Sequence, residues 1–204
     1  MASALLVRRV RVILALAVAA TTATLVVGVA PAGAGLGIAC PNPTTVPFAP
    51  WADYANYAFM PDGGFESGAS GWTLTGGASV RGGNESFYVH SSSDRSSLSL
   101  PAGSSATTPT MCIGLLSTKM RFVAAGDRNA KVKVQIIYRG LLSSVLGILD
   151  GGTIDTSGAW EPSPQMTMLG GLLPLLTQGV QFRFVALNGS STLDDVYLDP
   201  MKSA

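Results

Sequence analysis

Apolar and polar side chains alternate with a period of two in the middle of the chain, and this pattern constrains the fold more than any other feature of the sequence. Met120 and Phe122 mark one face of residues 118–123, and residues 131–138 carry apolar side chains at every second position. Successive side chains of a strand point to opposite faces, so each segment predicts a strand with one buried and one wet face, as in antiparallel sheets. The turn residues at 125–129 predict that the two strands form a hairpin.

Further short β-type segments lie on both sides of this region. The sequence predicts them at residues 72–75, 78–81, 86–90, 96–100, 166–168, 180–184 and 191–200. Residues 141–178 are ambiguous, because their apolar stretches lack a clean period and two Gly-Gly pairs argue against long helices. We interpret them as a strand, a loop through Trp160 and a strand near Met166, with residues 172–176 as an apolar loop or one helical turn. Many short strands with frequent turns indicate a sandwich or a barrel.

The first 34 residues have the layout of a secretory signal peptide. Three arginines at residues 8–11 precede a mostly apolar run over residues 12–30, and residues 32–34 form an Ala-Gly-Ala cleavage site. The run is close to the roughly 20 residues that span a bilayer, so an uncleaved membrane anchor is the alternative. Cleavage of residues 1–34 predicts a secreted, extracellular, single-domain protein with no membrane partner.

The remaining chain is slightly acidic, because the leader removes three arginines. It has no basic block to attract phosphate backbones, so nucleic acid is not an expected partner, and we expect a monomer. Its two cysteines, Cys40 and Cys112, predict a disulfide, since an even number of cysteines in an exported chain is typical of oxidised pairs. The other interpretation is a catalytic or metal-binding thiol, but neither cysteine has a histidine or a second cysteine nearby in the sequence.

Residues 35–60 form an N-terminal arm that is rich in proline and aromatic residues. Its prolines prevent a long helix and disfavour a central strand. Trp51, Tyr54 and Tyr57 are spaced three residues apart, which would align them on one face of a helical turn. The arm either packs its aromatic side chains onto the sandwich or presents them as a stacking platform for a ligand.

Two motifs at the ends of residues 61–204 give this domain a family resemblance. The domain opens with Gly63-Gly64-Phe65-Glu66 and Gly71-Trp72 and closes with Leu193-Asp194-Asp195-Val196-Tyr197-Leu198. The combination resembles the jelly-roll carbohydrate-binding modules and the wider galactose-binding-like sandwiches, and the chain as a whole is similar to small secreted actinobacterial proteins. The resemblance implies an all-β, antiparallel jelly-roll β-sandwich in which residues 61–72 and 191–200 are neighbouring strands. The disulfide would tie the arm onto this sandwich.

The same resemblance implies a structural calcium ion near the ends of the first and last strands. Its side-chain ligands would be Glu66 and Asp194, and oxygen ligands of this kind suit Ca²⁺. Strand alternation would place Asp194 on the core face with Val196 and Leu198, where a carboxylate needs a metal or hydrogen-bond partners, and would leave Asp195 solvated. In the alternative, Glu66 and Asp194 cap backbone amides without a metal.

The resemblance also implies a glycan ligand, because sugars stack on exposed aromatic side chains in these modules. The candidate stacking residues are Tyr88, Trp160, Trp51 and Tyr54, whereas Trp72 is expected in the core. We predict a binding module for an extracellular or cell-wall glycan or another cell-surface component. A structural or protein-interaction domain without sugar binding is the alternative, since a fold does not determine a function.

No residue pattern predicts catalysis. His90 is the only histidine, and although residues 91–94 supply serines and an aspartate, the sequence contains no nucleophile-elbow motif. A pair of carboxylates flanking a cleft, as glycoside hydrolysis needs, cannot be identified. A single histidine also excludes a histidine-rich zinc site. We therefore expect a protein that is not an enzyme.

Overall fold

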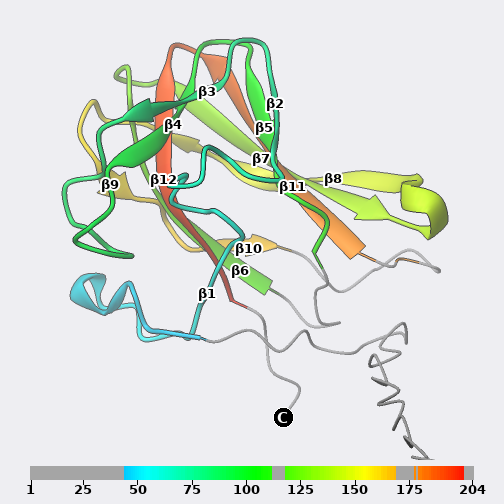
Figure 1. Ribbon diagram of the computed structural model, residues 1–204, viewed down its shortest axis with the longest axis horizontal. Helices are drawn as coiled ribbons and strands as arrows, with labels where there is room; N and C mark the ends of the chain where they lie inside the picture. The colour runs from blue at the N-terminus through cyan, green and yellow to red at the C-terminus, as the bar shows by residue number, and fades with distance from the viewer. Residues whose placement is uncertain (1–43, 112–117, 169–176, 178, 200–204) are drawn as a thin grey trace, which may run out of the picture. The chain divides into compact units, whose positions relative to one another are not determined.

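The residues described by the computed structural model are 44–111, 118–168, 177 and 179–199. They form two antiparallel β-sheets that bury a shared core, which confirms the predicted all-β sandwich (Figure 1). No helix within these ranges has the length and apolar character needed to cross a membrane. The predicted leader (residues 1–34), the predicted disulfide between Cys40 and Cys112 and the apolar segment at residues 172–176 lie outside the described residues.

The larger sheet contains seven strands. Its main path runs through β10 (Met166–Met168), β6 (Thr118–Gly126), β12 (Ser191–Asp199), β4 (Ser96–Leu100) and β3 (Ser79–Gly82). Two short strands extend this path, namely β1 (Ala58–Phe59) beside β12 and β9 (Glu161–Pro162) beside β6. β12 is therefore the central strand, with β6 along one side and both β4 and β1 along the other.

The smaller sheet contains five strands. Their order is β2 (Thr73–Thr75), β5 (Ser105–Thr107), β11 (Gly179–Asn188), β7 (Lys131–Arg139) and β8 (Val145–Asp155). β8 and β10 confirm the two strands predicted within residues 141–178, and β8 passes through one of the Gly-Gly pairs with a shift in its register against β7. Two single-turn 3-10 helices complete the fold, η1 (Ala49–Trp51) and η2 (Leu141–Ser143).

The predicted hairpin between residues 118–123 and 131–138 is wrong, because β6 and β7 belong to different sheets. The segment that connects β6 to β7 is hydrogen-bonded to the turn between β11 and β12. The Asp127 amide donates to the Ser190 carbonyl (2.8 Å), and the Ser190 amide donates back to Asp127 Oδ2 (2.7 Å). Gly126 permits this approach, since a Cβ there would lie 2.5 Å from the Ser190 carbonyl oxygen. Alternation identifies the core-facing residues of β6 and β7 correctly, but it does not identify the partner of either strand.

Both sheets bury one face in the shared core. Phe122 from β6 and Phe184 from β11 meet there edge to face, with ring centroids 5.3 Å apart. Trp72 also lies in the core, as expected, and its indole Nε1 donates to the Pro61 carbonyl (2.8 Å). Burying a large apolar side chain stabilises a fold by roughly 1.5–3 kcal/mol, so this core holds the two sheets together.

Residues 61–72 lie beside β12, but they form consecutive turns rather than the predicted strand. β1, just before them, makes the strand pairing with β12 instead. The Met60 amide donates to the Val196 carbonyl (3.0 Å), and the Val196 amide donates to the Gly63 carbonyl (3.1 Å). A Cβ at Gly63 would lie 2.8 Å from the Val196 carbonyl oxygen, so the glycine allows the turn to approach the strand this closely.

The arm packs onto the outer face of the seven-stranded sheet. Phe48 and Tyr57 are fully buried there against side chains of β6 and β12, so the arm packs aromatic side chains onto the sandwich, as the first interpretation predicts. Arg121 of β6 lies beneath them, with its guanidinium 4.5 Å from the Phe48 ring centroid and 3.0 Å from Asp53 Oδ2. The arm is thereby attached to the sheet by both apolar and ionic contacts.

The predicted helical alignment of Trp51, Tyr54 and Tyr57 is wrong. η1 ends at Trp51, because Ala52 has a left-handed conformation (φ 58°). Tyr57 forms an isolated β-bridge with Thr45, so this part of the arm doubles back on itself instead of continuing as a helix.

Candidate functional site

β12 carries a β-bulge that decides where its two aspartates point. Asp194 pairs with Val123 and Tyr197 pairs with Arg121, so β12 uses one more residue than β6 over this stretch. Asp195 takes up the extra residue in a left-handed conformation (φ 47°). Both aspartates therefore lie on the outer side of the seven-stranded sheet.

Because of this bulge, the predicted orientations of Asp194 and Asp195 are both wrong. Val196 and Leu198 belong to the core, but Asp194 does not share their face. Asp195 is fully buried rather than solvated. The extra residue of a bulge reverses which face the following side chains point to. Alternation of apolar and polar residues in the sequence does not reveal where such a bulge occurs.

Four carboxyl groups gather beneath the loop between β3 and β4. Glu85, Asp194 and Asp195 are fully buried, and Asp94 is 4% exposed. Asp194 accepts the Glu85 amide at Oδ2 (3.0 Å) and the Asp195 amide at Oδ1 (2.9 Å). Asp195 Oδ2 accepts the amide of His90 (2.9 Å). The cluster thus connects the loop to the central strand of the sheet.

The loop wraps around these carboxylates, and the strand predicted at residues 86–90 does not form. The Glu85 carboxylate accepts the amides of Phe87 and Val89, and Tyr88 between them has a left-handed conformation (φ 53°). Backbone amides that bond to carboxylates in this way are not available for a sheet ladder.

Burial raises the pKa of Asp194 to about 8 and the pKa of Asp195 to about 7, and neighbouring carboxylates add to both increases. His90 Nδ1 lies within hydrogen-bond distance of Asp94 Oδ2 (2.8 Å), and this contact is an ion pair only when the imidazole is protonated. Buried carboxylates are costly unless a cation or hydrogen bonds compensate them. The cluster therefore retains protons near neutral pH or requires a positive partner.

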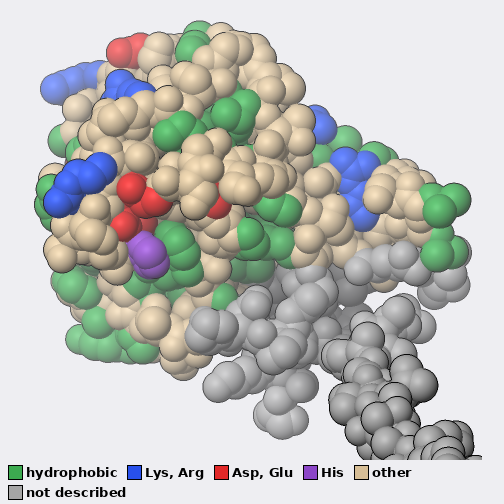
Figure 2. Space-filling view, viewed as in Figure 1, with side chains coloured by type: hydrophobic (Ala, Val, Ile, Leu, Met, Phe, Trp, Pro, Cys, Tyr) green, Lys and Arg blue, Asp and Glu red, His purple; other side chains and the backbone are tan. Residues whose placement is uncertain are grey.

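His90 reaches the surface beside this cluster. Its imidazole stacks on Phe59, with ring centroids 3.8 Å apart and 2° between the planes, and its side chain is 39% exposed. Figure 2 shows the single histidine at the surface next to acidic side chains. No serine hydroxyl in the described part of the chain hydrogen-bonds to the ring, so His90 and Asp94 have no nucleophile that would complete a triad.

The structure does not bring Glu66 and Asp194 together. Glu66 is exposed, and its Oε1 accepts the amides of Arg95 (2.7 Å) and Ser96 (2.6 Å). Both carboxylates thus cap backbone amides, which was the alternative to a metal. Calcium binding by Glu66 and Asp194 stays a prediction.

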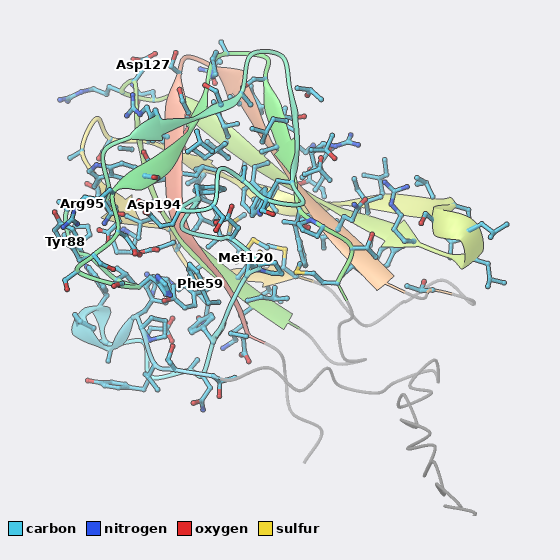
Figure 3. The ribbon with its side chains drawn as sticks, viewed as in Figure 1. Phe59, Tyr88, Arg95, Met120, Asp127 and Asp194 are labelled. Atoms are coloured by element: carbon cyan, nitrogen blue, oxygen red, sulfur yellow. The ribbon has the colours of Figure 1, made fainter. Side chains whose placement is uncertain are left out.

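The exposed and half-buried aromatic side chains lie on the arm, on the loop between β3 and β4, and just before β9. Among the predicted stacking residues, Tyr54 is 74% exposed and Tyr88 is 47% exposed. Trp51 is half-buried, with its ring edge-on to Phe87 at 5.0 Å. Figure 3 labels Tyr88 and Arg95, which both belong to the loop between β3 and β4. In the described part of the five-stranded sheet, the aromatic side chains all point into the core. The exposed aromatic side chains therefore lie on the side of the seven-stranded sheet.

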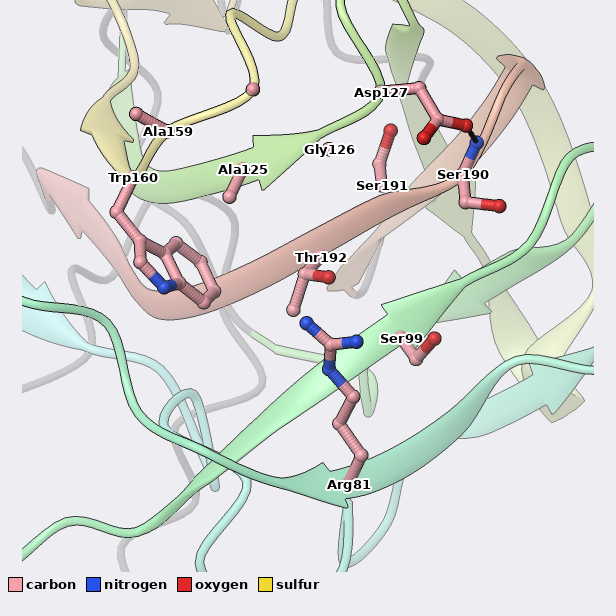
Figure 4. A pocket seen from close by; sticks show the side chains of 11 residues that line it. Arg81, Ser99, Ala125, Gly126, Asp127, Ala159, Trp160, Ser190, Ser191 and Thr192 are labelled. Carbon is pink, nitrogen blue, oxygen red and sulfur yellow. Dashed lines mark hydrogen bonds between the residues drawn. The ribbon is translucent and has the colours of Figure 1, made fainter.

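The outer face of the seven-stranded sheet contains an open pocket of about 370 Å³ (Figure 4). β3, β4, β6 and β12 form its floor, and the segment before β9 forms a wall. The lining side chains that can hydrogen-bond to a ligand or stack on it include Arg81, Ser99, Asp127, Trp160 and Thr192. In Figure 4 the Trp160 ring and the Arg81 guanidinium are directed into the same space.

Trp160 is thus the predicted stacking residue that the structure places in a pocket. Its ring also packs against the apolar cluster under the arm, which restricts its movement. The Arg81 side chain makes no hydrogen bond or ion pair with another described residue, so its guanidinium donors are free for a ligand. An indole face suits the C–H groups of a sugar ring, and a guanidinium suits hydroxyl or acidic groups.

Sequence analysis did not identify Arg81, Ser99 or Thr192 as site residues. The sequence does contain part of the signal, because Ser99 lies between the core residues Leu98 and Leu100 and must face outward. The adjacency of β3, β4 and β12 is what assembles the pocket. Strand order of this kind depends on connections between distant segments, which alternation does not reveal.

No protein-family model and no curated protein sequence matches the chain. Solved structures do match it. One that contains a carbohydrate-binding module, CBM22-1, reaches a TM-score of 0.50, and the chain shares its jelly-roll β-sandwich fold.

Three solved structures, one of them a tailspike domain, illustrate the likeness. The enzymatically active domain of tailspike protein 4 from bacteriophage CBA120 matches with a TM-score of 0.52 and 12% identity, over 70% of this chain and 21% of that chain. The CBM22-1 and GH10 modules of Clostridium thermocellum xylanase 10B, complexed with xylohexaose, match with a TM-score of 0.50 and 12% identity, over 68% of this chain and 28% of that one. TmCBM61 in complex with β-1,4-galactotriose matches with a TM-score of 0.48 and 16% identity, over 70% of this chain and 98% of that one.

The chain spans less than a third of the length of the first two proteins. At identities this low the likeness shows the fold alone.

Proposed function

We propose that this protein is a secreted, non-catalytic module that binds an extracellular or cell-wall glycan. The observation that carries the proposal is the pocket in which the Trp160 ring and the free Arg81 guanidinium face the same space. Its volume of about 370 Å³ lies in the usual range for small-ligand sites. The fold of a carbohydrate-binding module supports the same assignment.

Each part of the pocket has a task in this proposal. The indole face of Trp160 packs against the C–H face of a pyranose ring. Arg81 donates to sugar hydroxyls or to an acidic substituent, while Ser99 and Thr192 exchange hydrogen bonds with hydroxyl groups. The exposed Asp127 carboxylate at the end of the pocket accepts from further hydroxyls. The arm covers a neighbouring part of the same face, and Trp160 lies between that covered part and the pocket.

A glycan microarray screen of the untagged mature chain, followed by calorimetry with the best ligand, tests this proposal. Trp160→Ala should weaken binding by about tenfold or more, because it removes the stacking ring. Arg81→Ala should also weaken it, through loss of donors. Tyr54→Ala is the matched control, since it removes an exposed ring outside the pocket. Circular dichroism verifies that each variant is folded.

The outcomes separate the two predicted stacking surfaces. Equal affinities of the wild type and Trp160→Ala would show that the pocket is not the binding site. A loss of binding in Tyr54→Ala alone would assign the ligand to the arm. A wild-type chain that binds no glycan would refute glycan binding itself.

Secretion is a separate part of the proposal. It is supported by the arginines, apolar run and Ala-Gly-Ala site within residues 1–34. Mass spectrometry of the culture medium should detect a chain that begins at Gly35. A full-length chain recovered in the membrane fraction would favour the uncleaved anchor.

A second candidate function, protein interaction, is favoured by an apolar edge of the five-stranded sheet. β8 is an edge strand of that sheet, and edge strands can pair with another chain. The exposed apolar side chains of β8 and η2 are Leu141, Leu142, Val145, Leu146, Ile148 and Leu149. Light scattering during size-exclusion chromatography distinguishes the two functions. A monomer is expected for the glycan module, whereas a concentration-dependent dimer that Ile148→Lys abolishes would favour interaction.

A further inference from the structure

Asp195 presents a buried oxygen with no hydrogen-bond partner among the described residues. Its side chain is fully buried, and while Oδ2 accepts the His90 amide, Oδ1 has no donor. Native proteins rarely leave a buried polar atom unpaired, because its lost hydration is then uncompensated. The free oxygen therefore points to a ligand.

The backbone of Gly64 closely approaches this oxygen. A Cβ at Gly64 would lie 3.2 Å from Asp195 Oδ1 and 3.7 Å from Asp94 Oδ2. It would also lie 3.3 Å from the Phe59 ring, on which the His90 imidazole is stacked. Gly64 is thus in close contact with the surroundings of both carboxylates and of the histidine stack.

We propose that His90, Asp94 and Asp195 bind a divalent transition-metal ion, for which zinc is the probe. One ligand atom from each residue lies within 4.8 Å of the other two. An imidazole nitrogen with two carboxylate oxygens is a set that zinc accepts, with water as a fourth ligand. Because His90 is partly exposed, the site has access to solvent for that water and for entry of the ion.

The ligand chemistry separates this site from the implied calcium site. Imidazole nitrogen suits zinc and other transition metals, whereas calcium takes six to eight oxygens. Glu66 and Asp194, the implied calcium ligands, are both engaged by backbone amides.

The rest of the cluster favours a cation at this place. Glu85 and Asp194 are buried beside the proposed ligands, so the local charge is strongly negative once the carboxyls ionise. A divalent ion supplies the missing positive charge without needing His90 to be protonated. It would also join the loop between β3 and β4 to β12, and bound metal should therefore stabilise the fold.

Calorimetry and thermal unfolding of the chelator-treated, untagged chain test the proposal. We expect one zinc ion per chain. We also expect the unfolding temperature to rise by about 5–10 °C when zinc is present at roughly one hundred times its Kd. Calcium at the same concentration should shift it by no more than about 1 °C.

Variants identify the ligands. His90→Ala and the isosteric Asp195→Asn should each weaken zinc binding by about tenfold or more. Glu66→Gln is the matched control, since it neutralises an exposed carboxylate outside the site and should bind zinc like the wild type. If Asp195→Asn does not fold, His90→Ala still decides, because its side chain is partly exposed.

Three results would overturn the proposal: no zinc binding by the wild-type chain, unchanged zinc affinity in His90→Ala, or a thermal shift with calcium as large as the shift with zinc. None of them depends on whether the chain binds a glycan.

Discussion

Three glycines, Gly63, Gly64 and Gly126, decide how the chain meets β12. Gly63 and Gly126 let backbone approach backbone, since a Cβ at either position would fall within 3 Å of a carbonyl oxygen. Gly64 instead lets the backbone approach carboxylate side chains, since a Cβ there would lie 3.2 Å from Asp195 Oδ1. In the sequence all three resemble ordinary turn residues, and their different roles depend on what lies opposite each of them in the fold.

Gly64→Ala should therefore weaken zinc binding without altering any charge. Its Cβ would crowd Asp195 Oδ1 at 3.2 Å and contact Asp94 Oδ2 at 3.7 Å, and we expect a loss of about tenfold or more in zinc affinity by calorimetry. Gly82→Ala is the matched control, because a Cβ there would meet no atom within 4 Å. Equal zinc affinities in the two variants would argue against a metal bound to Asp94 and Asp195.

Among single residues, the aromatic side chains show the limit of sequence analysis. Trp72 was predicted in the core and lies there. Trp160 was one of four stacking candidates, and the sequence could not rank it above Tyr54 or Tyr88. What distinguishes Trp160 is a pocket assembled from strands far apart in the sequence.

At the scale of elements, alternation predicted the positions of the strands well. It predicted poorly which strands pair with each other. β6, β7, β10 and β11 lie where the pattern predicts, with the expected faces buried. The pattern missed the assignment of β6 and β7 to different sheets, because a turn sequence does not specify whether the chain returns in the same layer. It also missed the β12 bulge, which changes the direction of Asp194 and buries Asp195.

The arm is the element whose attachment depends on pH. Burial raises the pKa of Asp53, but hydrogen bonds from the Tyr57 hydroxyl (2.8 Å), the Ala55 amide (3.2 Å) and the Arg121 guanidinium outweigh it and hold that pKa below its usual value. A carboxyl whose pKa is lower in the folded state contributes stability above its unfolded pKa, at about 4. That contribution is lost as the pH falls through the folded pKa.

Asp53→Asn should thus destabilise the protein more at about pH 6 than at about pH 2, as measured by the free energy of unfolding in urea. Asp155→Asn is the control, because its carboxylate pairs with Lys131 in solvent, where such pairs contribute little. A difference between the wild type and Asp53→Asn that stays constant over this range would contradict the account of the arm.

At the scale of the whole domain, the outer faces of the two sheets differ in chemistry. The five-stranded sheet presents polar pairs, such as Lys133 with Asp150 (2.7 Å) and Arg139 with Gln181 (2.6 Å). The seven-stranded sheet carries the arm, the acidic cluster and the Trp160 pocket. A ligand recognised by stacking is therefore expected on the seven-stranded side.

An NMR titration of the ¹⁵N-labelled mature chain with its tightest glycan tests this claim most directly. The chain has three tryptophans, Trp51, Trp72 and Trp160, and each gives one indole N–H signal. We predict that the Trp160 signal shifts saturably with the Kd found by calorimetry. The Trp72 signal should stay in place, because its N–H is bonded to Pro61 in the core. A saturating shift at Trp51 with none at Trp160 would contradict the assignment of the pocket.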